Sequence, residues 1–225
     1  MEKKSSFLKS VKLKGLIELA LALLAVFAFR SSIAEPFVVP SGSMEPTILP
    51  GDRLVVSKLA YGLKFPFTHW YLTQFKEPER GDVIVFKFPQ NPSIHYVKRL
   101  IGLPGDDIDI RDGVITLNGT PFTVTPEVAQ PDGPQGEGHS KVYEEKVGSR
   151  FHVVQRLPHF VREEVQHIHV PAASYFFMGD NRDNSNDGRF WGFVPRENLE
   201  GKAEWVWLSY TWARGLQLKR FGISL

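Results

Sequence analysis

The 225-residue sequence contains no cysteine. Disulfides, thiol nucleophiles, iron–sulfur clusters and cysteine zinc sites are therefore excluded. Any nucleophile in this chain must be an oxygen or an amine nitrogen. Hydrophobic residues make up 42% of the chain and charged residues 23%, which is typical of a globular protein. The length fits one large or two small domains at ~150 residues each.

Outside the N-terminus, basic residues do not outnumber acidic residues. Residues 1–14 contain five lysines and one acidic residue, and the remaining 211 residues contain 22 basic and 24 acidic groups. The net charge of +2 therefore divides into +4 at the N-terminus and −2 elsewhere. A basic face for nucleic acid is disfavoured, and no nucleic-acid partner is expected.

An apolar run, Leu16–Phe29, follows these lysines. As a helix it would be about 21 Å long, short of a hydrocarbon core of roughly 30 Å. Extension to 13–34 gives about 33 Å and places Lys14 and Arg30 near the ends, where long side chains can reach the interface. The segment is therefore predicted to be a membrane helix.

Two interpretations of this helix remain open on the residues alone. In the first, the helix is a retained membrane anchor. In the second, it is a cleavable secretory signal, whose cleavage rule is met by the small residues Ser32 and Ala34. Both place the following chain outside the cytoplasm, because the lysine cluster stays inside.

From residue 35 onward, short β-rich runs recur between turn residues, so the fold class is predicted to be mainly β with antiparallel sheets. Asp112-Gly113 and Asn118-Gly119 are typical of hairpin turns. An exposed loop is expected over Pro131–Ser140, which is rich in glycine and proline. The predicted strands are Arg53–Ser57, Asp82–Phe88, His95–Ile101, a meander over 107–125, Phe151–Leu157, Gln166–Val170, Tyr175–Met178 and Glu204–Trp212.

The segment PSGSMEPT, Pro40–Thr47, brackets two serines and a glycine with prolines. Its backbone is stiff at both ends and permissive in the middle, which suits a serine held in an unusual position. An ordinary loop is the competing interpretation. The G-x-S-x-G pattern of an α/β-hydrolase is not present here.

The segment YVKRLIGLPGD, Tyr96–Asp106, places Lys98 among apolar neighbours on a predicted strand. Loss of hydration lowers the pKa of a lysine, and a neutral lysine can act as a general base. Arg99 cannot, because a guanidinium stays protonated. The competing interpretation is a lysine that extends from the strand into solvent.

The segment GDNRDNSNDGR, Gly179–Arg189, is dense in acids, amides and arginines. Its spacing fails the calcium-loop pattern, and the interleaved arginines favour internal ion pairs, so we interpret it as a structural network beside a site. His167 and His169 would share one face of a strand, but no third ligand is evident, and no metal site is expected.

Together these segments resemble the bacterial type I signal peptidases, also called leader peptidases. The matches are PSGSMEPT at 40–47, RGDVIVF at 80–86, YVKRLIGLPGD at 96–106 and GDNRDNS at 179–185, which continues to 195. The resemblance covers 35–106 and 171–210 well. It is weak over 107–170, which the family uses as a variable β insertion.

The resemblance implies a serine endopeptidase that removes N-terminal signal peptides from exported preproteins after Ala-x-Ala-like sites. Ser43 would be the nucleophile and Lys98 its general base. The Ser41 hydroxyl and the Ser43 backbone N–H would form the oxyanion hole. The residues expected to line shallow substrate pockets are Phe37, Val39, Pro40, Met44, Tyr96 and Val97.

Three further residues match positions that support such a site. Ser185 would hydrogen-bond Lys98 and orient it. Asp187 and Arg189 would hold the site in shape through an ion pair. The resemblance implies no metal and no cofactor.

The resemblance also implies the topology. Residues 1–14 would be a cytoplasmic basic segment, 15–34 a retained transmembrane anchor, and 35–225 an extracytoplasmic catalytic domain with the insertion at 107–170. The expected location is the bacterial plasma membrane, with a single pass. The expected partners are preprotein signal peptides and the phospholipid bilayer, and the chain is expected to be a monomer.

Two other classes compete with this hypothesis. One is a self-cleaving regulatory serine–lysine protease, which would carry a DNA-binding domain where this chain has its apolar run. The other is a noncatalytic anchored β domain that binds partners.

Overall fold

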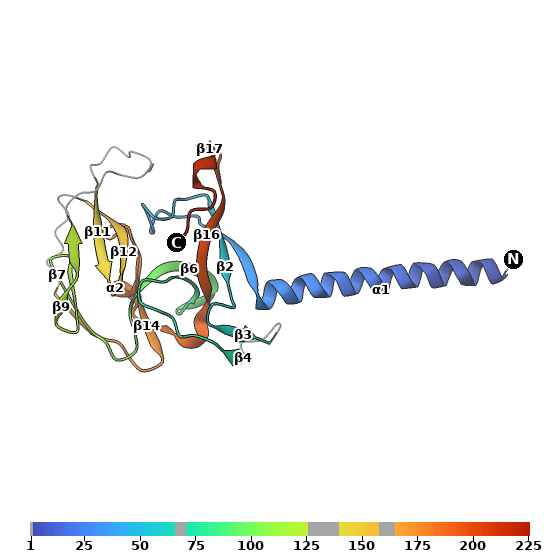
Figure 1. Cartoon of the computed structure of the whole chain (residues 1–225), viewed down its shortest axis with the longest axis horizontal. Coiled ribbons are helices and arrows are strands. Elements are labelled where there is room, and N and C mark those ends of the chain that lie inside the picture. Colours follow the sequence, from blue (N-terminus) through green and yellow to red (C-terminus); the bar gives the residue numbers. More distant parts are fainter. Residues whose placement is uncertain (1, 66–70, 126–139, 158–164) are drawn as a thin grey trace.

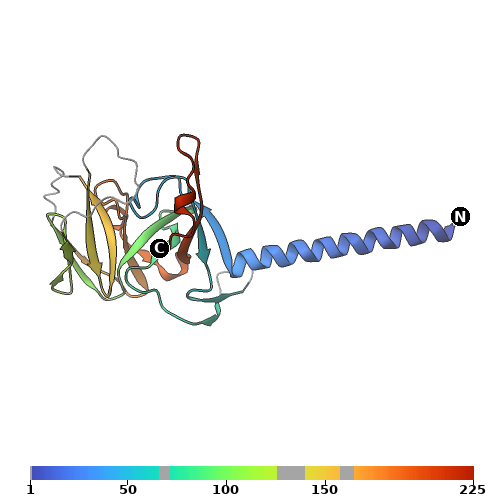
Figure 2. The same ribbon diagram turned by 45° about the horizontal axis from the view of Figure 1, so that its top comes forward.

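The computed structural model describes residues 2–65, 71–125, 140–157 and 165–225. A long helix, α1 (Glu2–Ser32), extends away from a body built of strands (Figures 1 and 2). The predicted membrane segment 15–34 is therefore helical as far as Ser32, and its last residue, Ala34, already begins strand β1 (Ala34–Val38). Within the described residues, no helix is both long enough and apolar enough to cross a membrane.

The main sheet is antiparallel and has the strand order β1-β2-β16-β5-β6-β14-β15, with β17 paired to β16. The prediction of a mainly β fold with antiparallel sheets is thus confirmed. The further bounds are β2 Asp52–Ser57, β5 Val83–Phe88, β6 Asn91–Gly102, β14 Ser174–Met178, β15 Val194–Pro195, β16 Leu199–Thr211 and β17 Gly215–Leu216.

Alternation of buried and partly covered side chains explains why β2 forms a strand. In β2, Leu54 and Val56 are fully buried while their neighbours are only partly covered. They pack with Val83 and Val85 of β5, and Met44 joins the same core cluster from the loop after β1. This cluster lies directly beneath the serine segment, so the sheet fixes the base of that loop.

The insertion forms two small sheets. One has the order β13-β7-β8-β9, with β7 at Asp107–Arg111, β8 at Val114–Leu117, β9 at Thr120–Pro121 and β13 at Gln166–His169. The other has the order β10-β11-β12, with β10 at Thr123–Thr125, β11 at Lys141–Val147 and β12 at Arg150–Arg156. The predicted meander over 107–125 is therefore divided between two sheets.

Both predicted hairpin turns are present. Asp112 and Gly113 have φ of 50° and 76°, and Asn118 and Gly119 have φ of 48° and 78°, the paired positive values of a two-residue hairpin turn. Of the predicted loop Pro131–Ser140, all but Ser140 lies outside the described residues.

Short elements complete the described fold. They are β3 (Gly62–Lys64), β4 (Tyr71–Gln74), the single-turn helix α2 (Gly188–Trp191), and the 3-10 turns η1 (Arg196–Asn198) and η2 (Leu218–Arg220).

Strands β1 and β11 were not predicted, and each has a local reason. Proline in β1, at Pro36, obscures a strand pattern, and it is tolerated because β1 lies at the edge of the main sheet. In β11, the fully buried Glu145 interrupts the apolar alternation.

Candidate active site

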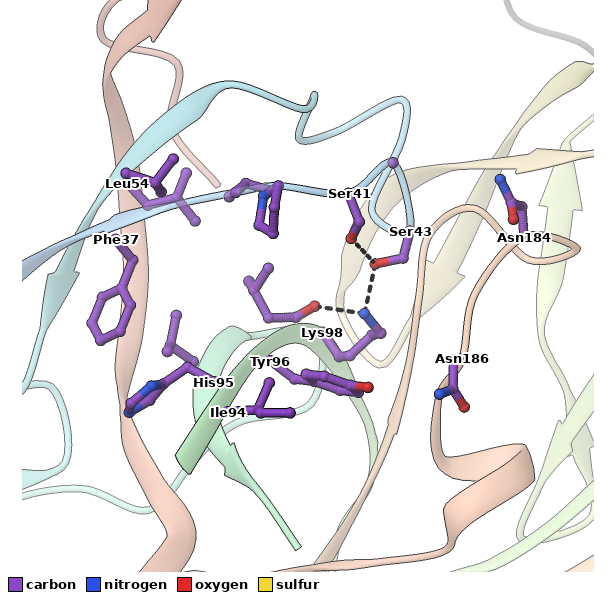
Figure 3. A pocket seen from close by; sticks show the side chains of 16 residues that line it. Phe37, Ser41, Ser43, Leu54, Ile94, His95, Tyr96, Lys98, Asn184 and Asn186 are labelled. Atoms are coloured by element: carbon purple, nitrogen blue, oxygen red, sulfur yellow. Dashed lines mark hydrogen bonds between the residues drawn. The ribbon is translucent and has the colours of Figure 1, made fainter. Parts of the chain in front are cut away.

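Ser43 lies in the turn that follows β1, and Lys98 points toward it from β6 (Figure 3). Lys98 Nζ donates a hydrogen bond to Ser43 Oγ at 2.6 Å. Ser41 Oγ lies 3.5 Å from Ser43 Oγ on the other side. The fold thus brings together two candidates that lie 55 positions apart in the chain.

The environment of Lys98 favours its neutral form. Lys98 is only 4% exposed. Burial lowers the pKa of its amine from 10.5 to about 8, although the carboxylates of Asp187 and Asp180 partly offset this effect. Its second hydrogen bond goes to the Val97 carbonyl at 3.1 Å. About one Lys98 in ten is then neutral at pH 7, which gives a resident amine base.

The backbone of the serine turn is held by the segment after β14. The Asn181 N–H donates to the Ser43 carbonyl at 3.2 Å, and the Asn181 side-chain amide donates to the Gly42 carbonyl at 3.0 Å. Gly179 allows this close approach, because a Cβ atom there would lie 2.4 Å from the Ser43 carbonyl oxygen. The two segments therefore fix each other's position.

The expected ion pair between Asp187 and Arg189 is present, with both Arg189 Nε and Nη2 donating to the carboxylate at 2.8 Å. Asp187 also accepts from the Gly179 N–H at 2.9 Å. Burial raises the pKa of this carboxyl, but Arg189 and the hydrogen bonds outweigh it, so that its pKa is lowered overall. Asp187 is therefore a buried anion that ties α2 to the segment holding the serine.

Ser185 does not form the hydrogen bond expected with Lys98. Its hydroxyl is buried and makes no hydrogen bond of normal geometry, although it approaches Asp187 closely enough to lower the pKa of that carboxyl. The hydrogen bonds of Lys98 go to Ser43 and Val97 instead. In this structure Ser185 fills space beside Gly179, where a Cβ atom would lie 2.2 Å from its oxygen.

The segment 179–189 forms the structural network that the sequence predicted. Asp180 is fully buried and accepts from Arg99 Nε and Nη2 at 2.8 and 2.7 Å. It also accepts from the Thr47 hydroxyl at 2.6 Å. The network thus joins the lysine strand to the end of the serine segment.

A groove opens beside the Ser43 hydroxyl, with a cavity volume of about 470 Å³. Five of the six predicted lining residues are there: Phe37, Val39, Pro40, Tyr96 and Val97. Met44 is not, because its side chain is fully buried in the core beneath β2. That prediction was wrong: the residue supports the groove from behind.

Several residues that line the groove were not predicted, among them Leu54, Val85, Ile94, His95, Asn184 and Asn186. Strand alternation could have indicated Ile94, which shares a face of β6 with Tyr96 and Lys98. The two asparagines flank Ser185 and lie at the Ser43–Lys98 end of the groove, away from Phe37 (Figure 3). Nothing in their local sequence distinguishes them from network residues.

Both histidines of the H-x-H pair face carboxylates across the β13–β7 ladder. His167 Nδ1 lies 2.8 Å from Asp109, and His169 Nδ1 lies 2.7 Å from Asp107. Among the described residues, no group of three or more histidine, aspartate or glutamate side chains is placed to hold a metal ion.

A serine hydrogen-bonded to a buried lysine, in an apolar groove of a β domain, is the arrangement of a serine peptidase. The family model described as "Signal peptidase, peptidase S26" matches residues 13–208. The chain belongs to this signal peptidase family. It is a serine endopeptidase of the signal peptidase I type, and its substrates are the signal peptides of preproteins.

Two curated relatives support the assignment along most of the chain. Signal peptidase I of Pseudomonas aeruginosa is 38% identical over 84% of this chain and 69% of its own length. That of Buchnera aphidicola subsp. Acyrthosiphon pisum is 35% identical over 95% and 82%. A solved signal peptidase I from Enterococcus faecalis is 27% identical and covers 57% of this chain and 98% of its own, with a TM-score of 0.34.

Proposed function

We propose that this peptidase cleaves with Ser43 as nucleophile and Lys98 as general base. The observation that carries the proposal is the 2.6 Å contact between Lys98 Nζ and Ser43 Oγ at a lysine whose pKa is lowered to about 8. Such an amine can accept the serine proton without a rearrangement of the site, as in other serine–lysine catalysts.

The reaction follows from these positions. Neutral Lys98 takes the Ser43 proton, and Ser43 Oγ attacks the carbonyl carbon of the residue before the cleavage point. The Ser43 N–H and the Ser41 hydroxyl donate to the oxyanion that forms. Protonated Lys98 then gives its proton to the leaving amine. The carbon–nitrogen bond breaks, and Lys98, neutral again, takes a proton from the water that attacks the acyl carbon. It returns this proton to Ser43 Oγ as the bond between the acyl carbon and Ser43 breaks. Apart from the substrate and one water molecule, every reacting group in this route belongs to the chain.

The substrate segment would enter the groove as an extended strand. Strand β1 is an edge of the main sheet, and its exposed backbone can pair with a peptide by β-augmentation. Phe37 of β1 and His95 of β6 have ring centroids 5.3 Å apart, so they bound the groove away from the serine (Figure 3). The short apolar walls formed by Val39 and Val97 would favour small residues and give Ala-x-Ala specificity.

We further propose the topology given by the resemblance: 1–14 cytoplasmic, 15–34 a single transmembrane anchor in the bacterial plasma membrane, and 35–225 an extracytoplasmic catalytic domain. Large apolar side chains on α1 are exposed from Leu16 to Phe27, at 49–63% of their surface. Burying them in lipid would stabilise the chain by roughly 25 cal/mol per Å² of apolar surface. The enzyme would act there as a monomer.

The test is cleavage of a defined preprotein with an Ala-x-Ala site by the full chain in detergent. Ser43→Ala and Lys98→Ala should each abolish cleavage while the circular dichroism spectrum stays that of the wild type. The matched controls are Ser149→Ala and Lys146→Ala, which change exposed residues of the β11–β12 hairpin. Full residual cleavage by either site variant would overturn the proposal.

A further inference from the structure

Glu145 is a buried carboxylate in the insertion. It lies on β11 and has no exposed surface. Arg182 pairs with both of its oxygens, and the Arg182 Nη1 to Glu145 Oε1 distance is 2.8 Å. Arg156 Nη2 and His152 Nε2 lie 3.6 and 3.3 Å from the same carboxylate. Such a group is expensive to bury and is stable only while these partners surround it.

The partner of Glu145 belongs to the segment that holds the serine. Arg182 Nε donates to the Gly179 carbonyl at 3.2 Å. The Arg182 carbonyl accepts from Arg189 Nη2 at 2.6 Å, and Arg189 in turn pairs with Asp187. One side chain of the insertion thereby anchors an arginine that contacts the segment at two points.

The backbone of the insertion makes a second connection. The Gln155 N–H of β12 donates to the Asp180 carbonyl at 2.8 Å, and the Arg182 N–H donates to the Gln155 carbonyl at 2.9 Å. This is a short parallel bridge between β12 and residues 180–182. Strands β11 and β12 lie on the β14 side of the main sheet (Figures 1 and 2), so the hairpin supports this segment from the side opposite the serine turn.

We propose that Glu145 is a positioning residue, which fixes Arg182 and through it the 179–181 backbone that holds the Ser43 carbonyl. The inference rests on the proposed function, since it concerns the geometry of the Ser43–Lys98 pair. It assigns the β11–β12 hairpin a role in catalysis that does not require contact with the substrate.

Distances explain how a change at Glu145 would reach the serine. Asn181 donates to the Ser43 carbonyl at 3.2 Å, and Gly179 lies against the same oxygen. Without the carboxylate, Arg182 would be a buried cation without its main anion, and its segment would shift to reach solvent or another acceptor. A displacement of about 1 Å at a reacting group can cost roughly 100-fold in rate.

The experiment compares Glu145→Gln with Glu144→Gln by steady-state cleavage of a peptide with an Ala-x-Ala site, using the full chain in detergent. Glu144 is the matched control because it neighbours Glu145 on β11 and points to the opposite face. Glu145→Gln should lower kcat by about 10-fold or more with KM within twofold, in line with a small misplacement of the pair. Glu144→Gln should leave both constants within twofold.

A double variant, Glu145→Met with Arg182→Met, removes both buried charges and covers the case in which Glu145→Gln does not fold. It should fold and show the same low kcat. Wild-type kcat in a folded Glu145→Gln or double variant would overturn the inference, as would unfolding of both. Ser43→Ala is assayed in parallel: residual cleavage there would count against the proposed function, whereas a normal Glu145→Gln beside an inactive Ser43→Ala counts against this inference alone.

Discussion

Lys98 Nζ lies 2.6 Å from Ser43 Oγ, although the two residues are 55 positions apart in the chain. The lysine comes from the long central strand β6, and the serine comes from the turn after the edge strand β1. Two independent elements are thus brought to hydrogen-bonding distance before any substrate binds. The consequences of this relationship can be measured through pH, stability and activity.

The activity should depend on pH through Lys98. Its pKa is about 8, and only the neutral amine can accept the serine proton. We expect kcat/KM to fall about tenfold per pH unit below the pKa and to level off above it. A pH–rate profile that is flat down to pH 5, measured with a substrate that does not titrate in this range, would contradict the assignment of Lys98 as the base.

Replacing the lysine should stabilise the fold while it abolishes activity. The pKa of Lys98 is lower in the folded chain than the ordinary 10.5, so protonation of the buried amine opposes folding. Below pH 8 the folded state bears the full penalty, up to about 3 kcal/mol, and the penalty disappears as pH rises toward 10.5.

Lys98→Met should therefore raise the urea midpoint at pH 7, by less than that maximum because the bond to Ser43 is lost. The gain should shrink when the same titration is repeated at pH 10. If the Lys98→Met chain were less stable than the wild type at pH 7, the buried protonated amine would not be destabilising the fold.

The buried pair of Arg99 and Asp180 should be needed for stability. Arg99 is only 5% exposed, and Asp180→Asn would leave its buried guanidinium without the anion that it pairs with. Breaking such a pair costs about 3–5 kcal/mol. Urea unfolding measures the change. The control is Lys76→Met, which removes an ammonium group from an exposed pair with Glu79 and should cost no more than ~1 kcal/mol. Equal effects from the two variants would contradict the prediction.

Gly179→Ala should disturb the serine turn directly. The new methyl carbon would lie 2.4 Å from the Ser43 carbonyl oxygen and 2.2 Å from Ser185 Oγ, so one of the segments must move. We expect kcat to fall about 100-fold, as for a displacement near 1 Å. Gly15→Ala is the control, since its methyl would meet no atom within 4 Å. Unchanged turnover in a folded Gly179→Ala chain would mean that the turn tolerates displacement.

Most of the local structure could be predicted from the sequence. Short β-rich runs between turn residues predicted β2, β5, β6 and β14, and paired turn residues predicted both hairpin turns, because strand propensity and positive φ angles depend on neighbouring residues. The absence of cysteine limited the nucleophile to oxygen or nitrogen. The residues alone left Ser43 as either a loop serine or a nucleophile, and the family resemblance selected it together with Lys98.

Which distant side chains come into contact could be read only from the folded chain. Met44 and Phe37 are both apolar and adjacent to the serine turn, yet Met44 is in the core and Phe37 lines the groove. Ser185 lies beside the site without bonding the lysine. Glu145, in the insertion where the sequence motifs resemble the family only weakly, contacts the arginine beside the site. Periodicity shows which face of a strand is apolar, but contacts between distant elements depend on how their sheets pack, and no local pattern specifies that.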